Sequence, residues 1–202
     1  MQSVLRPMEA KELRLLALCV GVSLVVHALA VWLAAPGGAR PPKETPAALA
    51  ERFAAAVNAA TDLDAADRAK LEASLTKVKR AGWRRLEMAE TLQWVAQEVG
   101  VPLSDCDLVR ALDAERAREG RWDIRAWVRW EAGADAEPFL RLAYLVGEGT
   151  LKSDFGSHRL WIHVEAPEGA GRVALETMDC RLFRAGKLSA ADLLHRARWF
   201  DG

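Results

Sequence analysis

The sequence predicts an α+β domain preceded by one membrane-spanning helix. Residues 15–33 carry no formal charge. From residue 47 to about 119, apolar side chains recur with the period of a helix. From residue 122 to 183, apolar and polar residues alternate in short runs, as in half-buried strands. Helices that come first and strands that come later are typical of the α+β class.

The first predicted element is a transmembrane helix over residues 15–35. At about 1.5 Å per residue, the uncharged run approaches the roughly 30 Å thickness of the hydrocarbon core. A cleaved signal peptide is the alternative, but its apolar core is usually about 7–15 residues long, so we favour an uncleaved anchor. Residues 1–14 then form a cytoplasmic head. Residues 36–46 form a short Pro- and Gly-rich linker.

The domain is expected to span residues 47–202 and to lie in the periplasm. A short head and a long tail fit a cytoplasmic N-terminus in the bacterial inner membrane. The Ala- and Arg-rich composition is typical of a high-GC bacterium. The chain has 28 basic and 28 acidic residues, so it lacks the basic excess of a nucleic-acid-binding protein.

About four helices are predicted in the first half of the domain. The first covers 47–60 and the second, capped by Thr61 or Asp62, ends near Gly82. The third covers 84–99, and Ser104 caps a fourth. Their apolar stripes are Leu49, Phe53 and Val57; Leu71, Leu75 and Val78; Leu86, Leu92, Val95 and Val99; and Leu108, Val109 and Leu112.

The second half is predicted to form a four-stranded antiparallel sheet and a C-terminal helix. The strands are placed at 122–131, 140–146, 160–164 and 173–183. Short connections that contain glycine favour an antiparallel meander over parallel crossovers. Ser189 is expected to cap the last helix, whose apolar residues are Leu193, Leu194, Ala197 and Trp199.

Inside the predicted span, Ser23 and His27 are four residues apart and therefore share one helix face. Cys19 continues the same stripe one turn earlier. An ionisable group at membrane depth is costly unless it meets a partner, so this face is a functional candidate. A plain anchor, whose histidine bonds locally, is the alternative.

The pattern Ser23-Leu-Val-Val-His27 resembles the signal-anchor of the TonB/TolA class of bacterial energy transducers. The resemblance covers about residues 10–35. It implies that the helix docks against a proton-driven motor of the ExbB–ExbD or TolQ–TolR type, and that Ser23 and His27 contact that motor. It implies no catalysis and no cofactor. An anchored periplasmic binding or assembly module, without motor coupling, is the alternative function.

Cys106 and Cys180 are the two cysteines of the predicted domain. In an oxidising compartment they could form a disulfide. Two buried free thiols are the alternative, because cysteine packs well as a small apolar residue.

A polar segment, residues 152–158, precedes the third predicted strand. Ser153, Ser157, His158 and Asp154 are residue types of a hydrolase, and His163 follows on the strand. No G-x-S-x-G elbow surrounds either serine, and the spacing matches no zinc-ligand pattern. We therefore interpret the segment as an exposed hairpin loop and predict no enzyme, metal site or cofactor.

Trp127 and Trp161 lie on the opposite phase of their strands from the main apolar residues. With Arg125, Arg129 and His163 nearby, they could form an aromatic and basic face for a partner protein or a glycan. The alternative, which the expected number of helices favours, is that helices cover this second face of the sheet.

Overall fold

The computed structural model of the 202-residue chain describes residues 45–78, 83–84, 87–131, 135–152, 157–166 and 169–201. The chain divides between Pro42 and Lys43 into two units, of which the second is described here. The predicted span 15–35, with Cys19, Ser23 and His27, lies outside the described residues. Among the residues that are described, no helix is both long and apolar enough to cross a membrane.

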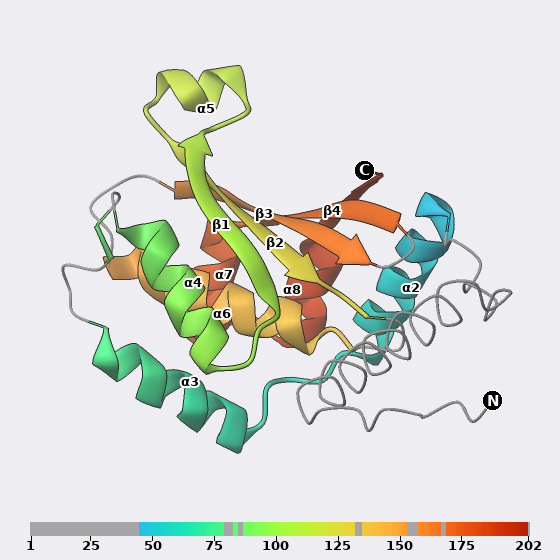
Figure 1. Ribbon diagram of the computed structural model, residues 1–202, viewed down its shortest axis with the longest axis horizontal. Coiled ribbons are helices and arrows are strands. Elements are labelled where there is room, and N and C mark those ends of the chain that lie inside the picture. The colour runs from blue at the N-terminus through green and yellow to red at the C-terminus, as the bar shows by residue number, and fades with distance from the viewer. Residues whose placement is uncertain are drawn as a thin grey trace, which may run out of the picture. The chain divides into compact units, whose positions relative to one another are not determined.

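Five strands form one sheet in the order β1-β2-β3-β4-β5, and the packed helices lie against one of its faces (Figure 1). In the described part of the chain the elements are α2 (Pro46–Ala59), α3 (Ala65–Lys77), α4 (Met88–Glu98), β1 (Leu103–Arg110), α5 (Ala114–Arg118), β2 (Trp122–Arg129), α6 (Glu137–Lys152), β3 (Ser157–Ala166), β4 (Gly169–Glu176), α7 (Thr177–Arg184), α8 (Ala190–Arg196) and β5 (Arg198–Asp201).

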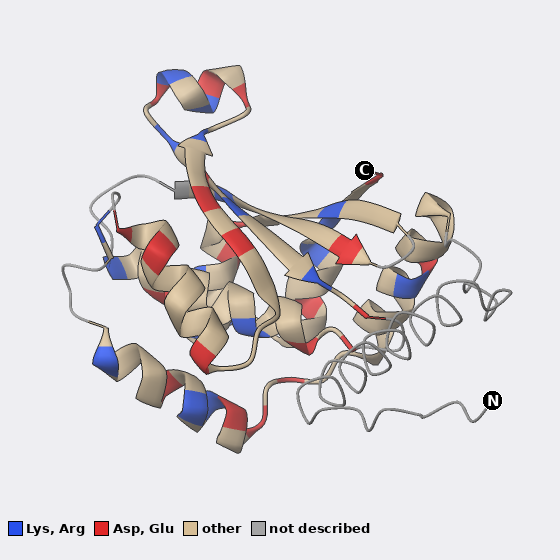
Figure 2. Cartoon of the chain, viewed as in Figure 1, with Lys and Arg blue, Asp and Glu red and all other residues tan. Residues whose placement is uncertain are grey.

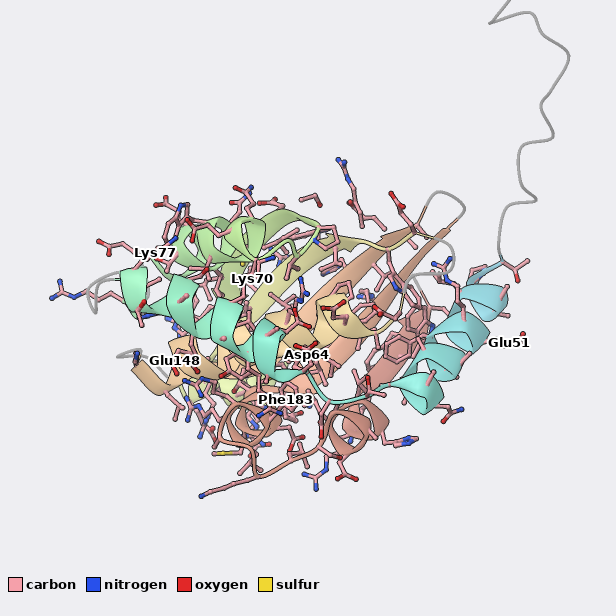
Figure 3. All side chains as sticks on the ribbon, turned by 90° about the horizontal axis from the view of Figure 1, so that it is seen from below. Glu51, Asp64, Lys70, Lys77, Glu148 and Phe183 are labelled. Carbon is pink, nitrogen blue, oxygen red and sulfur yellow. The ribbon has the colours of Figure 1, made fainter. Side chains whose placement is uncertain are left out.

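On the helical side of the sheet, one helix packs outside the layer of helices that contacts the strands. Helices α2, α4, α6 and α7 contact the strands, whereas α3 packs on α4 and α6. Figure 3 views the molecule from this side, with α3 and its residues Asp64, Lys70 and Lys77 in front. The core lies between the sheet and the inner helices, where Ile124, Leu160 and Val173 are fully buried.

The predicted four-stranded antiparallel sheet is wrong. The sheet is mixed: β2 and β3 run parallel, while the other three neighbouring pairs are antiparallel. Parallel neighbours need a crossover, and α6 supplies it in place of the strand predicted at 140–146. Burial explains the error, since α6 is buried on nearly all sides and its apolar residues therefore do not form a single stripe.

The fourth predicted helix is also wrong. Residues 103–110 form β1, in which Ser104 lies on the strand and caps no helix. The helix that follows is the short α5, whose N-cap is Asp113: its carboxylate accepts the N–H groups of Glu115 and Arg116. Strand β1 gains its stability from pairing with β2, a contact that local periodicity does not reveal.

The other elements agree with the sequence more closely. Leu49, Phe53 and Val57 are buried on α2, and Ser189 caps α8, as predicted. The second helix is capped by Asp64 instead of Thr61 or Asp62. The strand expected to reach Phe183 ends at Glu176, where α7 begins.

The two ends of the domain meet at one place. Trp199, predicted on the last helix, lies on β5, which pairs antiparallel with β4. Its ring packs on that of Phe53 from α2, with 5.2 Å between the ring centroids. The first helix of the domain therefore contacts its last strand.

Helices α6 and α7 pack closely because α6 carries glycine at the contact. A Cβ atom at Gly147 would overlap the backbone carbonyl of Cys180 on α7. One turn away, Arg184 on α7 forms an ion pair with Glu148 of α6 at 3.0 Å. The pair α6 and α7 thus forms a tight unit under the centre of the sheet.

Candidate binding site on the outer face of the sheet

Within the described residues, the helices pack on one face of the sheet (Figure 1), and we call the opposite face the outer face. Alternation places one set of side chains there, while the neighbours Ile124, Ala126 and Ile162 point into the core. The outer face is formed by Asp105 and Asp107 on β1, Asp123, Arg125, Trp127 and Arg129 on β2, Arg159, Trp161, His163 and Glu165 on β3, Arg172, Ala174 and Glu176 on β4, and Arg198 and Phe200 on β5.

Its centre is a stack of two aromatic rings. The indole of Trp127 and the imidazole of His163 stack nearly parallel, with an interplanar angle of 14° and 4.7 Å between centroids. The two residues are direct neighbours across the parallel β2–β3 pair. Both side chains are half-buried, so part of this flat surface faces solvent.

Arginines flank the stack. The guanidinium of Arg125 lies 5.5 Å from the centroid of the Trp127 ring, within the range of a cation–π contact. On the other side, Arg172 of β4 is the cross-strand neighbour of His163. Its Nε is buried and has no hydrogen-bond partner. Burial, followed by the charges of Arg125 and Arg172, lowers the pKa of His163 below its ordinary 6.5.

The basic centre has an acidic margin on β1. Asp107 forms an ion pair with Arg125, with 2.8 Å between Oδ2 and Nη2. Asp105 is exposed and is the cross-strand neighbour of Trp127. Figure 2 shows acidic positions on β1 and a basic position on β4. On the outer face, acidic residues thus line β1, whereas β4 and β5 carry Arg172, Arg198 and the acidic Glu176.

Trp161 closes the other half of the face. It is only 8% exposed, and side chains of the face itself enclose it: Phe200 lies 5.4 Å away between centroids and Arg159 5.8 Å. Its indole Nε1–H donates to Oδ2 of Asp123 at 3.0 Å. Trp161 is therefore mostly a structural residue, and Trp127 is the more accessible of the two.

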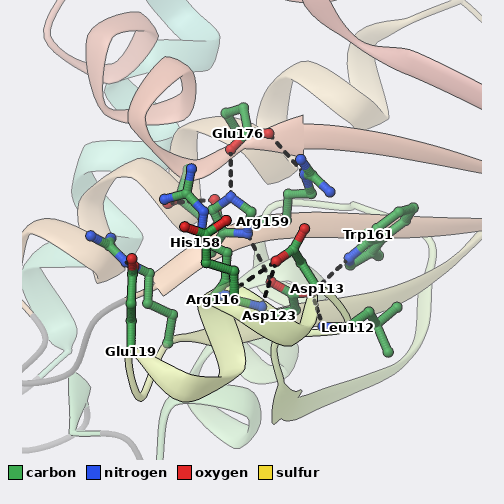
Figure 4. A network of polar contacts seen from close by, with 12 residues as sticks. Leu112, Asp113, Arg116, Glu119, Asp123, His158, Arg159, Trp161 and Glu176 are labelled. Atoms are coloured by element: carbon green, nitrogen blue, oxygen red, sulfur yellow. Dashed lines mark hydrogen bonds and ion pairs between the residues drawn. The ribbon is translucent and has the colours of Figure 1, made fainter.

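A buried polar cluster extends from Asp123 toward α5 (Figure 4). The carboxylate of Asp123 is 1% exposed and also accepts the N–H of Leu112 at 3.1 Å. Nδ1 of His158 faces its other oxygen at 3.7 Å, and Nε2 faces Glu176 at 3.4 Å. Each nitrogen of this imidazole thus has a carboxylate opposite it.

The structure brings most of the predicted partner face together. Trp127 and Arg125 lie side by side, and Arg129 lies exposed at the end of β2, opposite Glu165. The alternative was that helices cover this face, but no helix among the described residues does so, because Ser104 and Leu108 of the fourth predicted helix lie on β1. Sequence reasoning missed Asp123 and Arg172, although both follow the alternation that reveals Trp127.

Part of the hydrolase alternative lies outside the described residues, namely Ser153, Asp154 and the side chain of Ser157. His158 and Asp123 do approach each other, as given above. In the part of the chain that the structure describes, no group of three or more His, Cys, Asp or Glu side chains could hold a metal ion.

The two alternatives for the cysteines were a disulfide and two buried free thiols, and in the structure the thiols are free. Cys106 lies on β1 and Cys180 on α7, and both are buried. Burial, with the nearby Asp105 and Asp107, raises the pKa of Cys106 to about 12. Burial also raises the pKa of Cys180 well above its ordinary value.

Comparison with known proteins returns no relative: no protein-family model, no curated protein and no solved structure matches this chain.

Proposed function

We propose that the chain is a membrane-tethered binding module that holds an acidic segment of a partner protein on the outer face of its sheet. The observation that carries this proposal is the half-buried Trp127–His163 stack between Arg125 and Arg172. Residues 15–35 of the sequence supply the tether, with the domain on the periplasmic side.

The chemistry of the stack favours a protein segment as the ligand. Tryptophan and arginine are the residues most enriched among those that dominate binding energy at protein interfaces. A flat pair of rings offers apolar area at little cost in side-chain entropy. Beside it, Nε of Arg172 is buried and has no hydrogen-bond partner among the described residues. A carboxylate of the ligand can pair with this guanidinium group.

The charge gradient supports one orientation of that ligand. Asp105 and Asp107 on β1 repel acidic groups, whereas Arg172 and the exposed Arg198 on β4 and β5 attract them. We therefore place the acidic end of the bound segment over β4 and β5. Its apolar part lies on Trp127 and His163.

The experiment starts with a photoreactive residue at position 127 in the full chain, in cells, followed by identification of the captured protein. The purified partner is then titrated against Trp127→Ala and Arg172→Ala. Since truncating such a residue commonly costs more than about 2 kcal/mol, we expect each variant to bind at least tenfold more weakly. Affinity should also fall as salt rises.

A matched control is Trp94→Ala, because Trp94 is an exposed tryptophan, 43% accessible, on α4 of the helical side. It should leave affinity unchanged. Equal binding by Trp127→Ala and the unaltered protein, or an equal loss in Trp94→Ala, would overturn the proposal.

Motor docking through the span is a second candidate, carried by the Ser23-x-x-x-His27 pattern. In this proposal Ser23, His27 and Cys19 face a helix of an ExbB–ExbD or TolQ–TolR type motor, and the binding face is energised through the tether. Photoreactive residues at positions 27 and 25 test it. Position 25 lies off the stripe, so only position 27 should capture a motor subunit. Capture of lipid alone at both positions contradicts this candidate.

A further inference from the structure

A second site lies at the end of the sheet, apart from the Trp127–His163 stack. A cavity of about 220 Å³ opens between α5, the start of β3 and the start of α7. It is smaller than the roughly 300–1,000 Å³ of pockets for drug-sized ligands, so it suits a small group. Its polar wall consists of Arg116, Arg121, His158, Glu176, Thr177 and Arg181.

Ion pairs account for only part of the charge around this cavity. Arg121 is paired with Glu119 at 3.0 Å, and Glu176 is paired with Arg159 at 2.8 Å. The carboxylate of Asp113, the N-cap of α5, accepts two backbone N–H groups at the start of that helix.

Two guanidinium groups of this wall form no ion pair with a carboxylate among the described residues, although the charge of Asp113 acts on Arg116. Arg116 comes from α5 and Arg181 from α7, and both are half-buried. Arg181 is held in place by Thr150, to whose hydroxyl Nε donates at 3.1 Å and to whose carbonyl Nη2 donates at 2.7 Å. These bonds orient the guanidinium.

The buried imidazole gives a second, independent indication of a ligand. His158 is 7% exposed, and Nδ1 of its ring has no hydrogen-bond partner. The same is true of Oδ1 of Asp123, which faces it at 3.7 Å. Buried polar atoms are normally satisfied, and unsatisfied ones concentrate where a water, an ion or a substrate belongs.

We propose that this cavity binds a phosphate group, as the free dianion or as a monoester. The two guanidinium groups suit a phosphate group, because their planar N–H donors and positive charges match its oxygens. His158 lies in the same wall, with Asp123 and Glu176 facing its two nitrogens.

The test titrates the full-length protein with inorganic phosphate, methyl phosphate and acetate at constant ionic strength, following the ring signals of His158 by NMR and the melting temperature. Phosphate should shift the signals saturably and raise the melting temperature, since a ligand that binds only the folded state stabilises it. Acetate should do so much more weakly. Binding of methyl phosphate identifies a monoester site, and binding of inorganic phosphate alone identifies a site for the free ion.

Arg116→Gln is the informative variant, because the Arg116 side chain makes no hydrogen bond to another described residue. The substitution therefore removes no hydrogen bond of the described fold. Loss of a charged donor should weaken phosphate binding about tenfold or more. Arg118→Gln is the control, since Arg118 is exposed on the same helix and lies outside the cavity wall. No response to phosphate beyond that to chloride, or equal weakening in both variants, would overturn the proposal.

Discussion

Trp161 donates its indole N–H to Asp123 at 3.0 Å and thereby joins β3 to β2 on the outer face of the sheet. The bond lies between the two candidate sites, because Trp161 borders the aromatic face while Asp123 borders the cluster around His158. A carboxylate that is 1% exposed needs such donors to remain buried. Asp123 therefore positions side chains in both directions.

Replacing Trp161 by Phe should lower the free energy of unfolding by about 1–3 kcal/mol, because Asp123 loses a donor while remaining buried. Urea unfolding followed by circular dichroism measures the change. Trp127→Phe is the control, since Trp127 is half-buried and its ring lies on the same face. An equal effect of the two substitutions would show that ring size, and not the hydrogen bond, is responsible.

Gly147→Ala should destabilise the domain by about 1–3 kcal/mol, although alanine is the better helix former by up to about 1 kcal/mol. The added Cβ would meet the backbone carbonyl of Cys180, which cannot move without shifting α7. Gly149→Ala should also destabilise the domain, because there the Cβ would meet the fully buried side chains of Trp83 and Met88. Thermal unfolding of both variants compares them; a more stable Gly147→Ala protein contradicts the close packing.

The thiols should be unreactive in the folded domain. In a chain with Cys19→Ala, Ellman's reagent at pH 8 should label neither Cys106 nor Cys180 until urea is added, because burial keeps both protonated. The pKa of Cys106 rises from 9.0 to about 12 on folding, so its stabilising contribution is complete below pH 9 and is lost as the pH rises toward 12. Cys106→Ala should weaken that pH dependence. Rapid labelling of the folded protein would contradict the burial.

Arg172→Gln should raise the pKa of His163 toward its ordinary 6.5, since Arg172 is one of the two charges that lower it. NMR titration of the ring signals measures this change, with His163→Gln for assignment and Arg129→Gln as a control. Because the folded pKa lies below 6.5, the contribution of His163 to stability is complete above pH 6.5 and is lost as the pH falls through the folded value. An unchanged pKa would mean that Arg172 does not contribute and that burial and Arg125 lower it.

The predictions from the sequence were best for helices and strands that bury one face and expose the other, because their apolar residues recur with a regular period. Leu49, Phe53 and Val57 mark α2 because only one side of that helix is buried. Strand β2 shows strict alternation because one of its faces points into the core and the other toward solvent. Trp127 and Arg125 were found by the same logic, and the structure places them on the open face.

The errors fall where tertiary contacts decide the local structure. The sequence around Leu142 and Tyr144 has no single stripe because α6 is buried on most sides, so alternation was mistaken for a strand. Leu108 and Leu112 have a helix-like spacing, yet pairing with β2 makes residues 103–110 a strand. The cluster of Asp123, His158 and Glu176 joins three strands, and no local motif links residues that far apart in the sequence.

The contact of Phe53 with Trp199 has a mechanical consequence. A force applied along the chain at Thr45 would act first on α2. This helix contacts β5 through the Phe53–Trp199 ring pair and not through strand hydrogen bonds. The helix would detach at a lower load than the sheet, whose strands β1 to β4 are joined along their whole length. Tension applied at Thr45 would thus uncover the inner side of β5 before it separates the paired strands β1 to β4.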